Sequence, residues 1–154
     1  MKKLVFMNFS PNKSGNTFRI GQELLENVEY DVLQMSDYKI SQYGQVFEDD
    51  QISDVFKKIE DKDVILIGAP IYWYTVGGIL KTFIDRLYLL KEAEVLRGKE
   101  LYFFAQGSSP DENSINTIEY LVKRFSYLMG MKLKNVIVDS SQGCKVISDM
   151  TIYL

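Results

Sequence analysis

The residues best suited to chemistry in this sequence lie in one loop near the start of the chain. It reads Ser10-Pro11-Asn12-Lys13-Ser14-Gly15-Asn16-Thr17 and opens a segment with helical periodicity. A helix start presents free backbone N–H groups and the positive end of the helix dipole, which together bind anions. The hydroxyl and amide side chains here exceed what a plain helix cap needs, although such a cap is the alternative. We therefore predict a phosphate site formed by Ser10, Asn12, Ser14, Gly15, Asn16 and Thr17.

The kind of phosphate follows from what this loop lacks. A triphosphate-binding loop needs Gly-x4-Gly-Lys-Ser/Thr, whereas Ser10 stands here at the first glycine position and Asn16 at the lysine position. The dinucleotide fingerprint Gly-x-Gly-x-x-Gly is absent as well. The loop therefore favours a single phosphate monoester held by hydroxyl and amide groups.

A second loop carries three successive aromatic residues after an apolar run. It reads Pro70-Ile71-Tyr72-Trp73-Tyr74-Thr75-Val76-Gly77-Gly78. Consecutive residues of an extended loop cannot all face the core, so we expect at least one ring to be exposed. Exposed rings beside glycines suit a flat aromatic ligand, although packing of the rings under neighbouring loops is the alternative. A flat ring system that carries one phosphate is FMN.

Short apolar runs alternate along the chain with helical periodicity, which predicts one α/β domain over residues 1–154. Its parallel strands and crossover helices indicate a three-layer, doubly wound, five-stranded parallel sheet. The second strand alternates only partly, which places it at an edge and favours the order 2-1-3-4-5. Strands are expected at Leu4–Asn8, Tyr30–Met35, Val64–Gly68, Leu101–Ala105 and Val136–Val138, and helices at Asn16–Val28, Ile52–Ile59, Ile79–Leu87 and Ile115–Leu128.

The strand order decides where a ligand would bind. In an open α/β sheet, ligands lie outside the carboxyl ends of the strands, at the point where the strand order reverses. In the order 2-1-3-4-5 that point lies between the first and third strands, so the two loops meet there, with residues 106–110 beside them. The chain after the fifth strand predicts only a short or irregular helix, and a homodimer or higher homo-oligomer is one way to cover that face.

Composition excludes several kinds of chemistry. The 154 residues include one Cys and no His. That leaves no Ser-His-Asp or Cys-His nucleophile pair and no structural zinc set, so we expect no metal and no catalytic side chain. The net charge of −3 gives no global field for nucleic acid. No apolar run reaches a membrane span and no signal peptide is recognisable, so we expect a cytoplasmic protein without a membrane partner.

The two loops together resemble a known family. Ser10 to Thr17 is similar to the Ser-x-x-x-x-Gly-Asn-Thr phosphate loop of flavodoxin-like NAD(P)H-dependent FMN reductases. Pro70-Ile71-Tyr72-Trp73 followed by Leu80-Lys81-Thr82-Phe83-Ile84-Asp85-Arg86 resembles a second segment of the same family. Related iron–sulfur flavoproteins carry a cysteine cluster after the second strand, but residues 36–49 hold no Cys, which excludes that cluster here.

The resemblance implies the roles of the site residues. Ser10, Ser14, Asn16 and Thr17 would hold the FMN phosphate. Tyr74 stands where relatives often have Gly, so its ring would narrow the open face of the flavin. We expect Asp85 and Arg86 to form a structural ion pair, with a catalytic pair as the alternative. Further FMN contacts would come from Pro70, Ile71, Tyr72 and Trp73 along the isoalloxazine and from Gln106, Gly107 and Ser108 at its far edge.

The function implied is that of an FMN-dependent NAD(P)H oxidoreductase. NADPH or NADH would pass a hydride to the flavin, and a quinone, a flavin or an azo compound would take the electrons. One rival is an electron-carrier flavodoxin, although flavodoxins usually have a Thr-x-Thr-Gly-x-Thr loop and a more acidic surface. The other rival is an FMN-free scaffold of the same fold. A receiver domain and a small tyrosine phosphatase are excluded, because the acidic residues and the Cys-x5-Arg loop that they need are missing.

Overall fold

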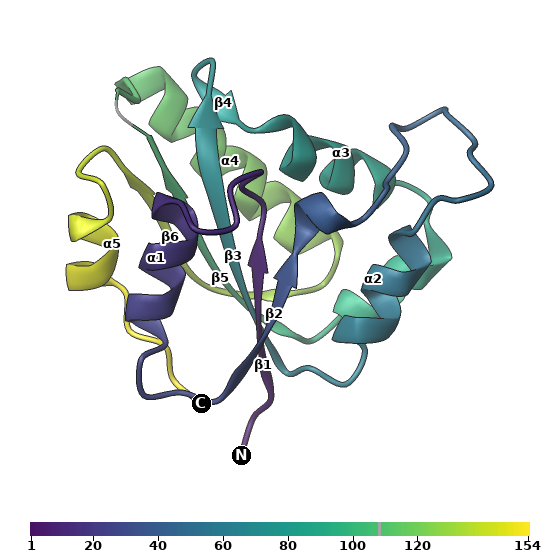
Figure 1. Ribbon diagram of the computed structural model, residues 1–154, viewed down its shortest axis with the longest axis horizontal. Coiled ribbons are helices and arrows are strands. Elements are labelled where there is room, and N and C mark those ends of the chain that lie inside the picture. Colours follow the sequence, from purple (N-terminus) through teal and green to yellow (C-terminus); the bar gives the residue numbers. More distant parts are fainter. Residues whose placement is uncertain (108) are drawn as a thin grey trace.

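The computed structural model describes residues 1–107 and 109–154, which form a parallel sheet between two layers of helices (Figure 1). Ser108, which the sequence places at the far edge of the flavin, lies outside the described residues. The elements in chain order are β1 (Leu4–Asn8), α1 (Asn16–Leu24), β2 (Tyr30–Gln34), η1 (Met35–Asp37), α2 (Ile52–Ile59), β3 (Val64–Tyr72), β4 (Thr75–Val76), α3 (Gly78–Arg86), η2 (Lys91–Leu96), β5 (Glu100–Gln106), α4 (Glu112–Leu128), β6 (Lys132–Asp139) and α5 (Cys144–Asp149).

The sheet has the predicted strand order. Its strands run β2-β1-β3-β5-β6 and pair in parallel, while β4 lies off this path and pairs antiparallel with β3. Since β5 and β6 are the fourth and fifth parallel strands, the order 2-1-3-4-5 is confirmed. Every residue of β1 is buried, whereas β2 at the sheet edge is partly exposed, as its partial alternation predicted.

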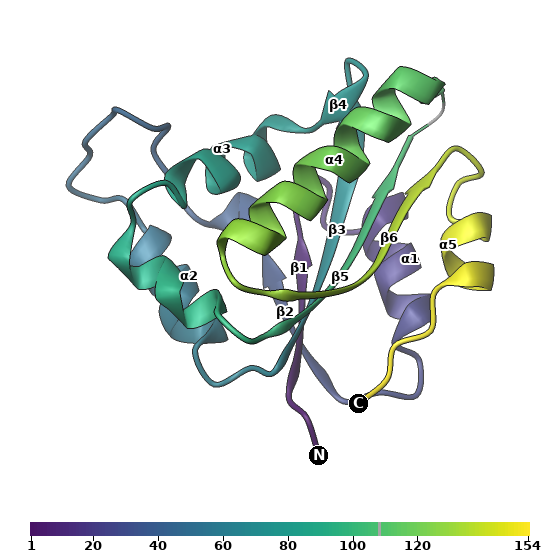
Figure 2. The ribbon, with the colours of Figure 1, turned by 180° about the vertical axis from the view of Figure 1, so that it is seen from behind.

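Alternate residues of the strands point to opposite faces of the sheet and pack into two separate hydrophobic cores. Val5 and Met7 of β1 pack toward α2, α3 and α4, whereas Leu4 and Phe6 pack toward α1 and α5. Figure 2 shows the first of these helix layers in front of the sheet and the other at its side. Gly21 lets α1 approach the sheet, because a Cβ there would lie 2.3 Å from the Phe6 ring. The three-layer fold is therefore confirmed.

Several element boundaries differ from the sequence prediction. The strand β3 continues to Tyr72 rather than ending at Gly68, so Pro70, Ile71 and Tyr72 lie in the strand and not in the loop in which they were expected. The helix of α1 ends at Leu24 rather than at Val28, since residues 25–27 form turns. The strand β6 starts at Lys132 rather than at Val136, and its ladder with β5 is interrupted between Leu101 and Tyr102. The two-residue strand β4 was missed, because so short a strand has no periodicity.

The end of the chain forms the short helix that the sequence indicated. The six-residue α5 contributes Val146 to the core beside α1, and Met150 after it is also buried. The Tyr153 backbone N–H then donates to the Tyr102 hydroxyl at 3.2 Å. Among the described residues, no helix is long and apolar enough to cross a membrane.

Candidate functional site

Three loops meet at the carboxyl end of the sheet, beyond β1, β3 and β5 (Figure 1). The loop after β1 is tied to β3 by the Phe9 N–H, which donates to the Gly68 carbonyl at 2.9 Å. The end of β5 reaches the start of α1, where the Gln106 side-chain N–H donates to Thr17 Oγ1 at 3.1 Å. The structure thus brings the predicted phosphate loop and aromatic loop, with Gln106 and Gly107, to the reversal point of the strand order.

The loop before α1 is held by its own side chains. Ser10 Oγ accepts the Asn12 N–H, and Asn12 Oδ1 accepts the Ser14 N–H, both at 3.1 Å. Gly15 is the N-cap of α1, and among the described residues no side chain caps the helix by a hydrogen bond. The loop's hydroxyl and amide groups are therefore not used as a plain cap, which was the alternative to an anion site.

The groups that the loop presents at the start of α1 fit a phosphate. Ser14 and Asn16 are exposed, and their side chains stand beside the uncapped helix start. Ser10 and Thr17 are buried, and their hydroxyl oxygens accept hydrogen bonds from within the site while each keeps a proton to donate. Backbone N–H groups and the helix dipole add the positive potential that a phosphate needs.

The aromatic loop is a two-residue hairpin between β3 and β4. Trp73 and Tyr74 form its turn and both have left-handed backbones, with φ of 48° and 63°. Such a turn normally takes Asn-Gly, and each bulky residue there costs about 1–2 kcal/mol. Tyr72, Trp73 and Tyr74 are 48%, 92% and 62% exposed. The expectation of exposed rings is confirmed, and strain of this kind gathers at functional sites.

The other residues beside this hairpin are less accessible. Pro70 is buried and its carbonyl accepts the Gly77 N–H at 3.1 Å. Ile71 is half-buried against Gly107, where an added Cβ would lie 2.9 Å from the Ile71 Cβ. Gly107 therefore lets the end of β5 approach the end of β3. An uncapped helix start with hydroxyl and amide groups and three exposed rings thus lie at the carboxyl end of the sheet, and these groups fit FMN.

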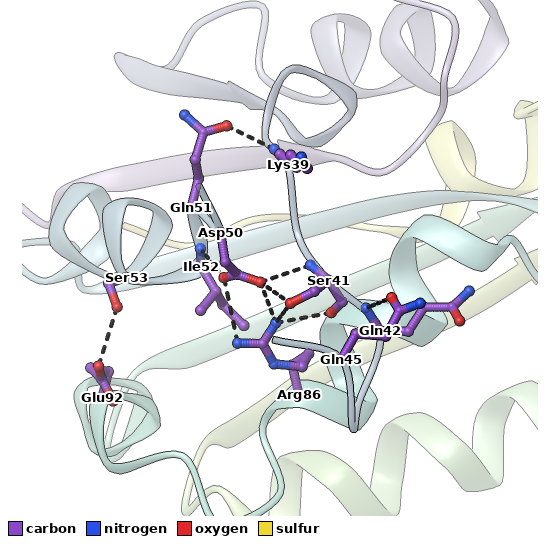
Figure 3. Close-up of polar contacts among 10 residues, drawn as sticks. All are labelled: Lys39, Ser41, Gln42, Gln45, Asp50, Gln51, Ile52, Ser53, Arg86 and Glu92. Carbon is purple, nitrogen blue, oxygen red and sulfur yellow. Dashed lines mark hydrogen bonds and ion pairs between the residues drawn. The ribbon is translucent and has the colours of Figure 1, made fainter. Parts of the chain in front are cut away.

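The predicted pairing of Asp85 with Arg86 is wrong, although the role of Arg86 is structural (Figure 3). Both residues lie at the end of α3, where neighbours in sequence point in different directions. Asp85 instead pairs with Lys81 one helical turn earlier, at 2.6 Å. Arg86 reaches across to the loop before α2, where Nη1 donates to Asp50 Oδ2 at 2.5 Å and to the Ser41 carbonyl at 2.9 Å.

The Asp50 carboxylate is the centre of this contact. Burial alone would raise the pKa of Asp50, but hydrogen bonds from Arg86, from the Ser41 hydroxyl and from the Ile52 and Ser41 backbones outweigh it. The pKa of Asp50 is therefore held well below its usual value. Asp50 lies 36 residues before Arg86, so no local spacing pattern indicates this pair.

Two further residues of the site were missed. Asn8 is fully buried at the end of β1, and its side chain bonds to Gln34 at the end of β2 and to the Ser10 backbone. A polar residue that closes an otherwise apolar strand was the available signal for Asn8.

In the part of the chain that the structure describes, no group of three His, Cys, Asp or Glu side chains is placed to hold a metal ion.

A doubly wound parallel sheet with a polar loop and an uncapped helix start after its first strand, and exposed rings at the end of its third, defines a flavodoxin-like protein. The chain belongs to the NADPH-dependent FMN reductase family, whose model matches residues 1–143. FMN is the cofactor of this family, with a nicotinamide nucleotide as donor.

Relatives in sequence agree with this family. An iron–sulfur flavoprotein of Archaeoglobus fulgidus is 34% identical over 97 residues, which cover 54% of this chain and 48% of that protein. The chain thus matches about half the length of that relative. YwqN of Bacillus subtilis, named as a proposed NAD(P)H-dependent FMN-containing oxidoreductase, is 23% identical over 154 residues, covering 88% of this chain and 83% of YwqN.

Solved structures show the same fold. The FMN-dependent NADH-azoreductase from Bacillus anthracis in complex with FMN superposes with a TM-score of 0.68 at 10% identity, over 96% of this chain and 92% of that one. The Trp repressor binding protein from Bacillus subtilis gives a TM-score of 0.69 at 21% identity, over 90% and 88%.

Proposed function

We propose that this protein is an FMN-dependent NAD(P)H oxidoreductase that reduces a small acceptor such as a quinone, a flavin or an azo compound. The observation that carries the proposal is the meeting of an uncapped helix start with three exposed aromatic residues at the reversal point of the sheet. Membership of the FMN reductase family supports it. An azoreductase of the same fold makes azo compounds a reasonable class of acceptor to test.

The residues of the chain would bind and orient rather than react. FMN, when bound, supplies the ring that accepts and donates hydride, so no protein nucleophile or imidazole is needed. We assign Ser10, Ser14, Asn16 and Thr17 to its phosphate, with Asn12 and Gly15 shaping the loop. The ring would lie along residues 70–74, with residues 106–108 at its far edge. A flat donor or acceptor would then enter beside Trp73, the most exposed of the rings.

Tyr74 is the residue that would control entry to the open face. Its ring is 62% exposed and held by a strained turn, so its removal loses little packing. We expect Tyr74→Gly to lower the KM for a bulky azo acceptor while the unfolding midpoint changes little. Tyr153→Gly, which removes a 68% exposed tyrosine at the far end of the sheet, is the matched control. An unchanged KM in Tyr74→Gly would contradict this role.

Assembly and location complete the proposal. The rings of the hairpin and of the neighbouring loops are exposed in the single chain, which supports a homodimer or a higher homo-oligomer. Sedimentation velocity of the purified protein tests this directly, and a monomer at micromolar concentration would contradict it.

Cys144 is free and exposed, which supports a reducing compartment such as the cytoplasm.

The decisive experiment is an absorbance spectrum before and after an anaerobic donor is added. We expect the purified protein to carry or take up FMN and the flavin band to bleach rapidly with NADPH or NADH. A flavin band that neither donor bleaches, with fast exchange to a redox protein, would instead identify an electron carrier. A colourless protein that takes up no FMN would overturn the proposal in favour of a scaffold.

A further inference from the structure

A buried amide side chain, that of Asn8, and a half-buried one, that of Gln34, hold the first residue of the phosphate loop from both sides. Asn8 and Gln34 are paired in register on β1 and β2. Asn8 Oδ1 accepts the Ser10 N–H at 3.1 Å, while Gln34 Nε2 donates to the Ser10 carbonyl at 2.7 Å. Asn8 Nδ2 donates to Gln34 Oε1 at 2.6 Å and closes the ring of contacts.

The orientation of both amides is fixed by this ring. The backbone N–H of Ser10 needs an acceptor and its carbonyl needs a donor, so Asn8 must present oxygen and Gln34 must present nitrogen. The two remaining amide atoms, a nitrogen of Asn8 and an oxygen of Gln34, are then complementary to each other. Gln34 Nε2 also donates to Ser36 Oγ at 2.8 Å. A carboxylate at position 34 could not donate to the Ser10 carbonyl, and an apolar side chain at position 8 or 34 would leave one Ser10 group without its partner.

The same pattern continues along the loop toward the helix. Asn8, Ser10 and Asn12 each accept, through the side chain, the N–H of the residue two positions later, in all three cases at 3.1 Å. These steps lead from the end of β1 to Ser14, directly before the N-cap of α1. Because each step fixes the residue that makes the next, the contact at Asn8 sets the course of the whole loop.

The burial of Asn8 places this arrangement in the interior of the protein. Asn8 is 0% exposed and follows Leu4 to Met7, which are all apolar and buried. A buried amide costs free energy unless its hydrogen bonds are made, and an apolar residue would fill the same place without that cost. Among the described residues, no buried side-chain nitrogen or oxygen lacks a partner. Burying the Asn8 amide is therefore costly, and its contacts with Ser10 and Gln34 satisfy it.

We propose that Asn8 and Gln34 are positioning residues that hold the phosphate loop in its binding conformation before the ligand arrives. The proposal rests on the FMN function proposed above. A loop that is already ordered loses less conformational entropy when the phosphate binds, so the phosphate group contributes more to affinity. Neither residue is placed to touch the phosphate itself, since both act through Ser10.

The test compares FMN with riboflavin, which has the same ring and lacks the phosphate. The ratio of the riboflavin Kd to the FMN Kd measures the contribution of the phosphate. We expect Asn8→Ala and Gln34→Met to lower this ratio by about 10-fold, as the loss of one or two hydrogen bonds implies, and to leave the riboflavin Kd within about 2-fold. Gln34→Glu accepts from Asn8 but cannot donate to the Ser10 carbonyl, so it should behave like Gln34→Met.

Gln51→Met is the matched control. Gln51 is half-buried like Gln34, and its Oε1 also holds a loop backbone, accepting the Lys39 N–H at 2.8 Å in the loop before α2 rather than a group of the phosphate loop. Its FMN and riboflavin affinities should equal those of the wild type. Amide hydrogen exchange of the flavin-free protein gives a second readout, in which Asn12 and Ser14 should exchange faster in Gln34→Met than in the wild type.

The outcomes separate this proposal from the proposed function. A wild-type protein that binds FMN much more tightly than riboflavin, with the same ratio in Asn8→Ala and Gln34→Met, would overturn the positioning role alone. Equal weakening of FMN and riboflavin would also overturn it, because that result indicates general structural damage. A wild type that binds neither flavin would overturn the FMN function and this proposal with it.

Discussion

Replacing Arg86 with methionine would remove the contact that fixes the loop before α2 while keeping a side chain of similar length. The guanidinium donates to Asp50 Oδ2, to Ser41 Oγ and to the Ser41 carbonyl at 2.5–2.9 Å (Figure 3). Arg86 and Asp50 are only 17% and 14% exposed, so water replaces little of what is lost. The variant therefore leaves a largely buried carboxylate without its cation.

The expected loss of stability follows from this burial. Removing one partner of a fully buried ion pair costs about 3–5 kcal/mol. Asp50 keeps its hydrogen bonds from the Ser41 hydroxyl, the Ser41 N–H and the Ile52 N–H, which places Arg86→Met nearer about 2–3 kcal/mol. For a domain of this size such a loss lowers the unfolding midpoint by about 5–10 °C.

Urea unfolding of four variants, Arg86→Met, Asp50→Asn, their double variant and Arg97→Met, checks this value. Arg97→Met is the matched control, because Arg97 pairs with Glu94 while both side chains are more than 60% exposed, and such pairs contribute under about 1 kcal/mol. The double variant of Arg86 and Asp50 should be less destabilised than the sum of the single variants. If Arg86→Met unfolds within about 0.5 kcal/mol of the wild type, the burial argument is refuted.

The same pair predicts a dependence on pH. The pKa of Asp50 is lower in the folded protein than in the unfolded chain, so its contribution is complete above the unfolded value of about 4. It is lost as the pH falls below that value, because the unfolded state then takes up the proton first. The stability advantage of the wild type over Asp50→Asn should therefore be constant near pH 7 and shrink below about pH 4. An advantage that grew with acid would contradict this sign.

Three further changes have expected outcomes. Gly21→Ala should destabilise the protein by about 1–3 kcal/mol in urea, because its Cβ would overlap the Phe6 ring, whereas Gly78→Ala enters open space and should be neutral or stabilising. Lys99→Met should cost about 1–3 kcal/mol, since the largely buried ammonium donates to two backbone carbonyls just after α2; a midpoint equal to that of the wild type would exclude this role. Trp73 is the single tryptophan and 92% exposed, so its fluorescence should peak at long wavelength and be quenched by FMN; emission that FMN leaves unchanged would separate Trp73 from the flavin.

The fold could be predicted because its signals are local and redundant. A continuous apolar run such as Val64–Gly68 suits only a strand buried on both faces, and the helices that separate such runs force parallel pairing. The partial alternation of β2 was sufficient to place it at the edge of the sheet. Boundaries were less certain, because the first half of β6 is half-exposed and its ladder is interrupted.

The site was predictable only in its outline. The polar loop before α1 and the three rings at the end of β3 stand out in the sequence, and the fold brings them together at the carboxyl end of the sheet. The contacts that position them depend on residues that lie far apart in sequence. Asn8 and Gln34 are 26 positions apart, and Asp50 and Arg86 are 36 apart. Asp85 pairs with Lys81, which lies four positions earlier on the same face of the helix. The prediction of an Asp85–Arg86 pair considered only neighbours in sequence and missed this spacing.

The central place of β1 has a consequence for the time course of folding. Its residues pair with β2 on one side and with β3 on the other, where Leu4 pairs with Val64. The second edge of β1 can therefore pair only after a residue 60 positions later has been synthesised. Closing loops of this length makes parallel sheets slow to form, on the order of milliseconds to seconds. Until β3 has been synthesised, one edge of a strand whose first four residues are all apolar is open to other chains. Aggregation during expression is therefore most readily reduced by a lower concentration of incomplete chains, as at a lower expression level, rather than by changes to the folded surface.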